Sequence, residues 1–199
     1  MVKLFLCVLF IVSGSLSYAQ LPPPECTMPV PDHPDQPWQK HVCKTIWVDG
    51  CPAKVCYCYR VANHGPAVHH DYYIVSIQPL EVCGIGDYET WVQHVKDQLV
   101  LSNPELVTYY PCPTSISTTR VMSAACWQWT WMSLPFGLQV PFFTPCDYGA
   151  LCTKVYELCI DQDGNLTIKS SLITFSGQVN CVNTGGWPAG VCRALNCFE

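Results

Sequence analysis

The sequence predicts a mainly β fold, with disulfide-rich antiparallel sheets in a sandwich-like arrangement and one α-helix near residues 87–102. Segments rich in β-branched and aromatic residues alternate with turn signals along most of the chain. One segment has apolar residues at helical spacing. The 15 cysteines among 199 residues add a covalent framework.

The first 19 residues have the features of a secretory signal peptide. Lys3 precedes an apolar run that is short for a membrane span, and small residues stand at Ser17 and Ala19. We expect cleavage after Ala19, with an uncleaved membrane anchor as the alternative. No later apolar stretch is long enough to cross a bilayer, so we expect a secreted, extracellular protein with no membrane span after removal of the signal.

The cysteine content indicates disulfides and not a metal site. Cys7 lies within the signal peptide, which leaves an even number of cysteines in the mature chain. Export favours disulfides, and the spacing of Cys51, Cys56 and Cys58 lacks the paired C-x-x-C motifs of a structural zinc site. The sequence leaves the connectivity open, but we predict that every mature cysteine is paired: Cys26, Cys43, Cys51, Cys56, Cys58, Cys83, Cys112, Cys126, Cys146, Cys152, Cys159, Cys181, Cys192 and Cys197.

The charge balance excludes some classes of partner. The chain has a net charge of −5, with 13 % charged and 12 % aromatic residues. An acidic chain without a basic run is a poor ligand for nucleic acid or an anionic membrane. Few charges and many rings instead favour a surface that other protein subunits cover.

Residues 20–37 are rich in proline and lack apolar periodicity, so we expect an extended arm. Such an arm is a spacer or lies on a neighbouring subunit, and Cys26 is expected to attach it to the body. Residues 38–199 are long enough for a single disulfide-stapled β domain, and two halves that meet near Cys112 are the alternative.

The elements follow in order along the chain. Strands are predicted over residues 41–48, 54–61 and 71–78, with a turn at Asp49 and Gly50 between the first two. Asp87 is a suitable N-cap for the helix, and the segment Ser102-Asn-Pro104 ends it. Its apolar face carries Tyr88, Trp91, Val92, Val95 and Leu99. Its solvent side is expected to carry Glu89, Gln93, Lys96 and Asp97.

The second half returns to strands, over residues 116–122, 126–132, 135–143, 151–160 and 165–175. The last two form a hairpin around the turn Asp161-Gln-Asp-Gly164, because glycine suits a left-handed turn position. This turn resembles the start of a calcium loop, but the positions of Gly164 and Leu172 do not match an EF-hand. The turn interpretation is therefore favoured.

The segment Cys126-Trp-Gln-Trp-Thr-Trp-Met132 places Trp127, Trp129 and Trp131 on one face of a strand. Three exposed indoles would exceed the apolar area that a monomer usually exposes. The row therefore belongs to the core, to a subunit interface or to a carbohydrate platform.

The strand over residues 54–61 favours the core. Its cysteines, Cys56 and Cys58, share one face and should bridge to two different partners. Its opposite face is apolar: Val55, Tyr57, Tyr59 and Val61. Packing of this face against the tryptophan row would make a shared core, and the question that stays open is whether Trp131 reaches the surface.

Two further patterns are weak candidates for sites. The side chains of His64, His69, His70 and Asp71 are of the kinds that bind zinc or copper, but their spacing matches no known motif, so an ordinary loop is favoured. The motif Asn165-Leu-Thr makes Asn165 a candidate glycosylation site.

Motifs for catalysis and for cofactors are missing, and only scattered carboxylates such as Asp71, Asp87 and Asp147 could form an acid–base pair. We therefore expect no cofactor and lean away from an enzyme. The sequence favours a secreted structural or interaction protein, a subunit of an extracellular assembly, filament, sheath or matrix. Its expected partners are other subunits, including copies of itself, or a polysaccharide. A carbohydrate-binding module that uses the tryptophan row is the alternative, and a secreted hydrolase is the third interpretation.

Overall fold

The structure is a computed structural model. It describes Cys26, Pro37, Trp38 and residues 40–64, 67–103, 111–112, 117–181, 187–195 and 197. The predicted signal peptide and nearly all of the Pro-rich arm lie outside the described residues.

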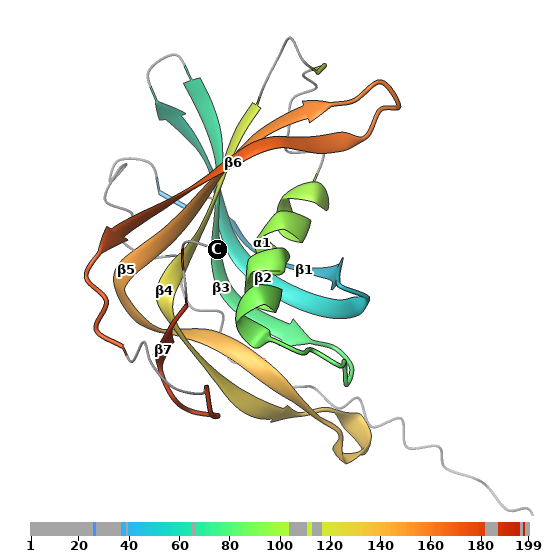
Figure 1. Ribbon diagram of the computed structural model, residues 1–199, viewed down its shortest axis with the longest axis vertical. Coiled ribbons are helices and arrows are strands. Elements are labelled where there is room, and N and C mark those ends of the chain that lie inside the picture. The colour runs from blue at the N-terminus through green and yellow to red at the C-terminus, as the bar shows by residue number, and fades with distance from the viewer. Residues whose placement is uncertain are drawn as a thin grey trace, which may run out of the picture.

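One seven-stranded sheet with a helix on one face makes up the described chain (Figure 1). The strands follow the order β1-β2-β3-β4-β5-β6 across the sheet, and β7 lies beside β4. Their bounds are Lys40–Val48 (β1), Cys51–His64 (β2), Ala67–Pro79 (β3), Ser117–Ser133 (β4), Gln139–Ile160 (β5), Leu166–Gly177 (β6) and Arg193–Ala194 (β7). Helix α1 spans Tyr88–Leu101, and a 3₁₀ turn spans Pro135–Gly137.

The mainly β character and the single helix of the described chain confirm the predicted fold class, but the sheet arrangement differs in two ways. The strands form one sheet instead of two stacked ones, and β4 runs parallel to β3, with Tyr72 beside Val121. A parallel neighbour requires a crossover connection, and α1 lies within that connection. The other strand pairs are antiparallel, including the predicted hairpin of β5 and β6.

Helix α1 begins as predicted and is buried more widely than predicted. The Asp87 carboxylate accepts hydrogen bonds from the backbone N–H groups of Glu89 and Thr90, both at 3.1 Å. The expected solvent positions Gln93 and Lys96 are only 8 % and 2 % exposed, so that part of the prediction was wrong. This side of the helix lies against β5, because the neighbouring Asp97 accepts hydrogen bonds from the Lys154 ammonium and the Tyr156 hydroxyl, both at 2.6 Å.

The main core lies between α1 and the sheet. It combines rings from β2, β3 and β4 with Trp91 of the helix and Phe143 of β5. Tyr57 of β2 and Trp127 of β4 belong to this core, yet they lie on the same side of one sheet, with β3 between their strands. The prediction that the two strands share a core was therefore right for Trp127 and Trp129, and the prediction that the two strands face each other was wrong.

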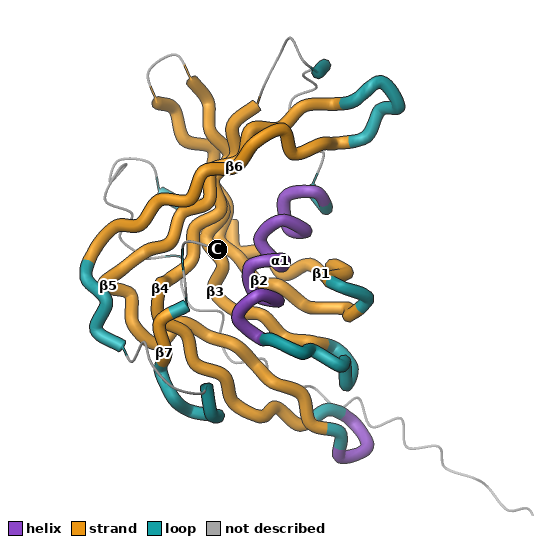
Figure 2. Tube along the Cα trace, viewed as in Figure 1, coloured by secondary structure: helices purple, strands orange, loops and turns teal. Residues whose placement is uncertain are grey.

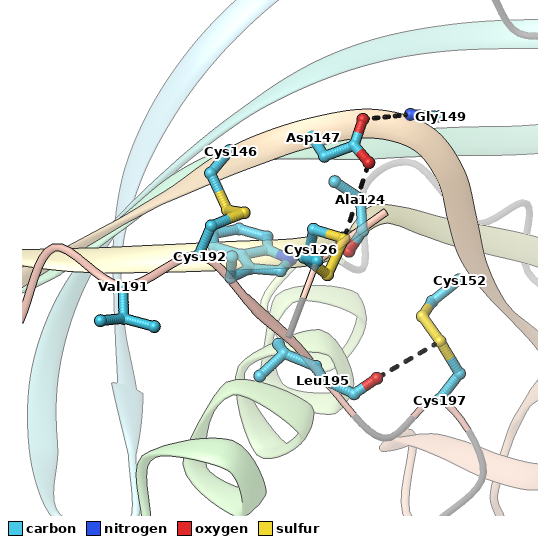
Figure 3. The surroundings of a disulfide bond; sticks show 12 residues. Ala124, Cys126, Cys146, Asp147, Gly149, Cys152, Val191, Cys192, Leu195 and Cys197 are labelled. Carbon is cyan, nitrogen blue, oxygen red and sulfur yellow. Dashed lines mark hydrogen bonds between the residues drawn. A yellow bond between two sulfur atoms is a disulfide. The ribbon is translucent and has the colours of Figure 1, made fainter. Parts of the chain in front are cut away.

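Seven disulfides pair the fourteen cysteines from Cys26 to Cys197, and they fall into two groups along the chain. The N-terminal group is Cys26–Cys58, Cys43–Cys56 and Cys51–Cys83. The C-terminal group is Cys112–Cys159, Cys126–Cys181, Cys146–Cys192 and Cys152–Cys197. Cys56 and Cys58 bind different partners, as predicted. The C-terminal group fastens the end of the chain onto β4 and β5 (Figure 3).

Candidate interaction site

The tryptophan row divides into two core residues and one surface residue. Trp127 is fully buried, and its indole N–H donates to the Ala124 carbonyl at 2.7 Å. Trp129 is 7 % exposed, and its N–H donates to the Trp187 carbonyl at 2.8 Å. Trp131 packs edge-on against Trp129 and is 54 % exposed. A flat platform of three rings is therefore not available to a carbohydrate.

Beyond Trp129, β4 and β5 continue together as a hairpin that projects from the body of the molecule (Figure 1). Trp131 pairs with Pro141, and Ser133 pairs with Gln139 at the last register position. The 3₁₀ turn closes the hairpin at its far end (Figure 2). We call residues 131–141 the β4–β5 tip.

The β4–β5 tip exposes large apolar side chains and has no charge. The Phe136 side chain is completely exposed, and Leu138 is 50 % exposed, in addition to Trp131. No aspartate, glutamate, lysine, arginine or histidine occurs anywhere over residues 121–146. Isolated exposed apolar residues are common, but such a group on one projecting hairpin indicates a binding surface.

The backbone conformation of the tip is energetically unfavourable for Phe136. Phe136 has φ 65° and ψ 20°, and Gly137 has φ 76°. A bulky side chain is disfavoured at positive φ, where glycine, asparagine and aspartate are the usual residues. A non-glycine residue held there costs about 1–3 kcal/mol. Because Phe136 buries no surface inside the protein, folding does not explain the choice of phenylalanine.

The sequence contains two features of this site that are less conspicuous than the tryptophan row. One is the charge-free run of residues 121–146, and the other is the dipeptide Phe136-Gly137 between two strand segments. Neither signal is a recognised motif. Both acquire meaning only when the hairpin is seen to project and the phenylalanine is seen to be exposed.

The candidate metal ligands do not converge on one point. His69 and His70 are successive residues of β3, so their side chains point to opposite faces of the sheet. The His70 Nδ1 atom lies 3.0 Å from the Tyr59 hydroxyl, and burial lowers the pKa of His70. The side chain of His64 lies outside the described residues.

Asp71 is paired with two arginines. Its carboxylate is completely buried and accepts hydrogen bonds from Arg60 Nε at 2.9 Å and from Arg120 Nε at 2.7 Å. The Arg60 guanidinium also lies 4.7 Å from the ring centre of Trp38. The three charged residues occupy adjacent positions on β2, β3 and β4 and form a structural bridge across the sheet.

The turn between β5 and β6 is a hydrogen-bonded hairpin turn. The Asp161 carboxylate accepts from the N–H groups of Asp163 and Asn165, and the Gly164 N–H donates to the Asp161 carbonyl. These contacts account for the residues that resembled a calcium loop. Asn165 is exposed at the start of β6, so it stays a predicted glycosylation site.

The carboxylates that could have formed an acid–base pair have separate structural roles. Asp71 bridges two arginines, and Asp147 accepts from the Gly149 N–H at 3.0 Å (Figure 3). Asp87 caps α1, and the hydrogen bond from Thr90 lowers its pKa. An open cleft of about 340 Å³ lies beside this cap, and its acidic residues are Asp49, Glu81 and Asp87.

The comparisons with known proteins assign no family. Neither the protein-family models, nor the curated proteins, nor the solved structures contain a match to the chain. Within the described residues, neither α1 nor the 3₁₀ turn has the length and apolarity that a membrane-crossing helix requires.

Proposed function

We propose that the protein is secreted and works outside the cell as an interaction protein, attaching itself to an extracellular assembly, sheath or matrix through the β4–β5 tip. The single observation that carries this proposal is Phe136. It is completely exposed, at a backbone position where folding favours a different residue. Such a residue is retained when its contacts lie outside the protein.

The disulfides support the extracellular location. Seven pairs use every mature cysteine, and disulfides persist in oxidising compartments. The carboxylates that the sequence singled out, Asp71, Asp87 and Asp147, are each engaged in structural contacts.

The test uses the tip variant Phe136→Asn/Leu138→Asn. The wild-type protein, recovered from the culture medium of its own cells, is expected to sediment with large particles or insoluble matrix. The variant is expected to stay in the soluble fraction as a monomer. A wild-type protein that is strictly monomeric in the medium and associates with nothing would contradict the proposal, as would unchanged sedimentation of the variant.

A further inference from the structure

The shape of the β4–β5 tip limits what it can bind. The exposed fractions of Trp131, Phe136 and Leu138 are 54 %, 101 % and 50 %. For side chains of roughly 150–250 Å², these fractions amount to an apolar area of about 400 Å². One side of a standard protein interface contributes about 800 Å², of which a little over half is apolar. Area alone therefore does not separate a protein partner from a lipid surface, but the tip projects instead of forming a groove.

The chemistry of the tip suits the interior of a lipid surface. Residues 121–146 contain no charge that would have to be dehydrated on insertion. Pro135 has no backbone N–H, and the Leu134 N–H donates to the Leu138 carbonyl at 2.6 Å, so two of the turn's donor positions need no water.

The order of the side chains along the hairpin is also suitable. Phe136 lies at the apex, and Trp131 lies farther back on β4, beside Pro141. Insertion of the apex would place phenylalanine in the hydrocarbon region and tryptophan near the headgroups. Tryptophan is enriched at the headgroup level of membrane proteins.

The charge of the rest of the protein limits the kind of lipid. The chain has a net charge of −5, and Asp49, Glu81 and Asp87 line the open cleft at the start of α1. This helix start lies beside the base of the hairpin, where Tyr88 packs on Trp129 with 5.5 Å between ring centres. A negatively charged membrane would repel these groups, whereas a zwitterionic membrane would not.

We propose that the β4–β5 tip inserts into the surface of a zwitterionic lipid bilayer and so anchors the protein peripherally. This inference rests on the proposed function, in which the tip is the docking element, and it adds that the docking surface is lipid. The contact is shallow, because only the apolar end of the hairpin is free of the body.

The experiment is co-sedimentation of the purified mature protein with vesicles of dioleoylphosphatidylcholine. Binding of the wild-type protein is expected, and Phe136→Asn/Leu138→Asn should weaken the partition coefficient by about tenfold or more, since two buried apolar side chains are lost. The matched control is Leu172→Thr, which removes another exposed apolar side chain, on β6, and should leave binding unchanged. Replacing about 30 mol % of the lipid with phosphatidylglycerol should weaken binding, and added salt should restore it.

A second readout locates the contact. Brominated phosphatidylcholine should quench tryptophan fluorescence in the wild-type protein, and Trp131→Phe should remove most of this quenching. Absence of vesicle binding, or equal loss of binding in the Leu172 control, would overturn the lipid proposal. If vesicles do not bind but the tip variant still leaves the particulate fraction of the medium, the docking surface is a protein and the proposed function stands. If vesicles bind but the tip variant remains in that fraction, the proposed function fails and the lipid contact stands.

Discussion

Asp49 and Phe136 are the two non-glycine residues of the described chain with positive φ, at 52° and 65°, and each is followed by a left-handed glycine. The turn between β1 and β2 has Asp-Gly between the paired residues Val48 and Cys51, and the β4–β5 tip has Phe-Gly within a longer loop between Ser133 and Gln139. Aspartate tolerates positive φ, whereas a bulky phenylalanine is disfavoured there. The conformation of the turn therefore accounts for aspartate at position 49 but does not account for phenylalanine at position 136.

Phe136→Asn is therefore expected to stabilise the protein while it removes the apex of the tip. Asparagine tolerates the left-handed conformation, so the free energy of unfolding should rise by about 0.5–1 kcal/mol. Urea denaturation followed by near-ultraviolet circular dichroism measures this change. A loss of stability would show that Phe136 contributes to folding and would weaken the argument for an external contact.

Trp127→Ala and Trp131→Ala should have very different effects. Trp127 is fully buried, so its truncation is expected to cost about 3–5 kcal/mol or to prevent folding. Trp131 is 54 % exposed, and its truncation should cost about 1 kcal/mol or less. The yield of folded protein and its urea midpoint distinguish the two. Similar losses for both variants would contradict the division of the row into core and surface residues.

Lys96 should make stability depend on pH. Burial lowers its pKa to about 7, and the Lys154 ammonium adds to this effect. From about pH 7 to about pH 10 the folded protein keeps Lys96 neutral, while the unfolded chain binds a proton. The unfolded state thus binds more protons, so stability is expected to rise with pH, by up to about 1.4 kcal/mol per unit.

Lys96→Met tests this source of the pH dependence. The variant should be about 1–4 kcal/mol more stable at neutral pH, because no buried amine has to lose its charge. It should also show a smaller slope of stability against pH. Lys169→Met, at an exposed position of β6, is the matched control and should change neither quantity. An unchanged slope in Lys96→Met would assign the pH dependence to other groups.

Asp71→Asn should destabilise the protein by about 3–5 kcal/mol. The substitution keeps the shape of the side chain but removes the negative charge between Arg60, which is 2 % exposed, and Arg120. Asp163→Asn, at the exposed turn after β5, makes the same chemical change and should have an effect within about 0.5 kcal/mol. Chemical denaturation compares the two, and equal effects would mean that the bridge across the sheet contributes little.

The disulfide map should contain no link between the two halves of the chain. Tryptic digestion of the unreduced, denatured protein, followed by mass spectrometry, is expected to give linked peptides only within residues 26–83 and only within residues 112–197. Any linked pair that joins a cysteine of one group to a cysteine of the other would contradict the arrangement.

Local patterns predicted the local elements of this protein. Asp87 and the spacing of Trp91, Val95 and Leu99 were enough for the helix, because capping and helical period are encoded over a few residues. The parallel pairing of β3 with β4 was not predictable, because it depends on the path of the chain between Pro79 and Ser117. The burial of Lys96 was not predictable either, because a lysine is usually exposed and its burial depends on how α1 lies against the sheet.

The candidate site also could not be predicted from local sequence patterns. The tryptophan row was the most conspicuous surface feature of the sequence, but two of its members are core residues. Phe136, the most exposed large apolar residue, did not stand out in the sequence because one phenylalanine in a turn has no pattern. Its significance depends on where β4 and β5 end relative to the body, which sequence periodicity does not report.

The separation of the disulfides into two groups has a consequence for how the chain matures. If the chain is exported from its N-terminus, the six cysteines from Cys26 to Cys83 enter the oxidising compartment before the eight that follow. The first group can close before the second group competes for its thiols. If each group pairs only within itself, the number of possible disulfide patterns is on the order of 10³. For fourteen cysteines that pair freely, it is on the order of 10⁵. The order of export can thus limit mispairing between the two groups of cysteines.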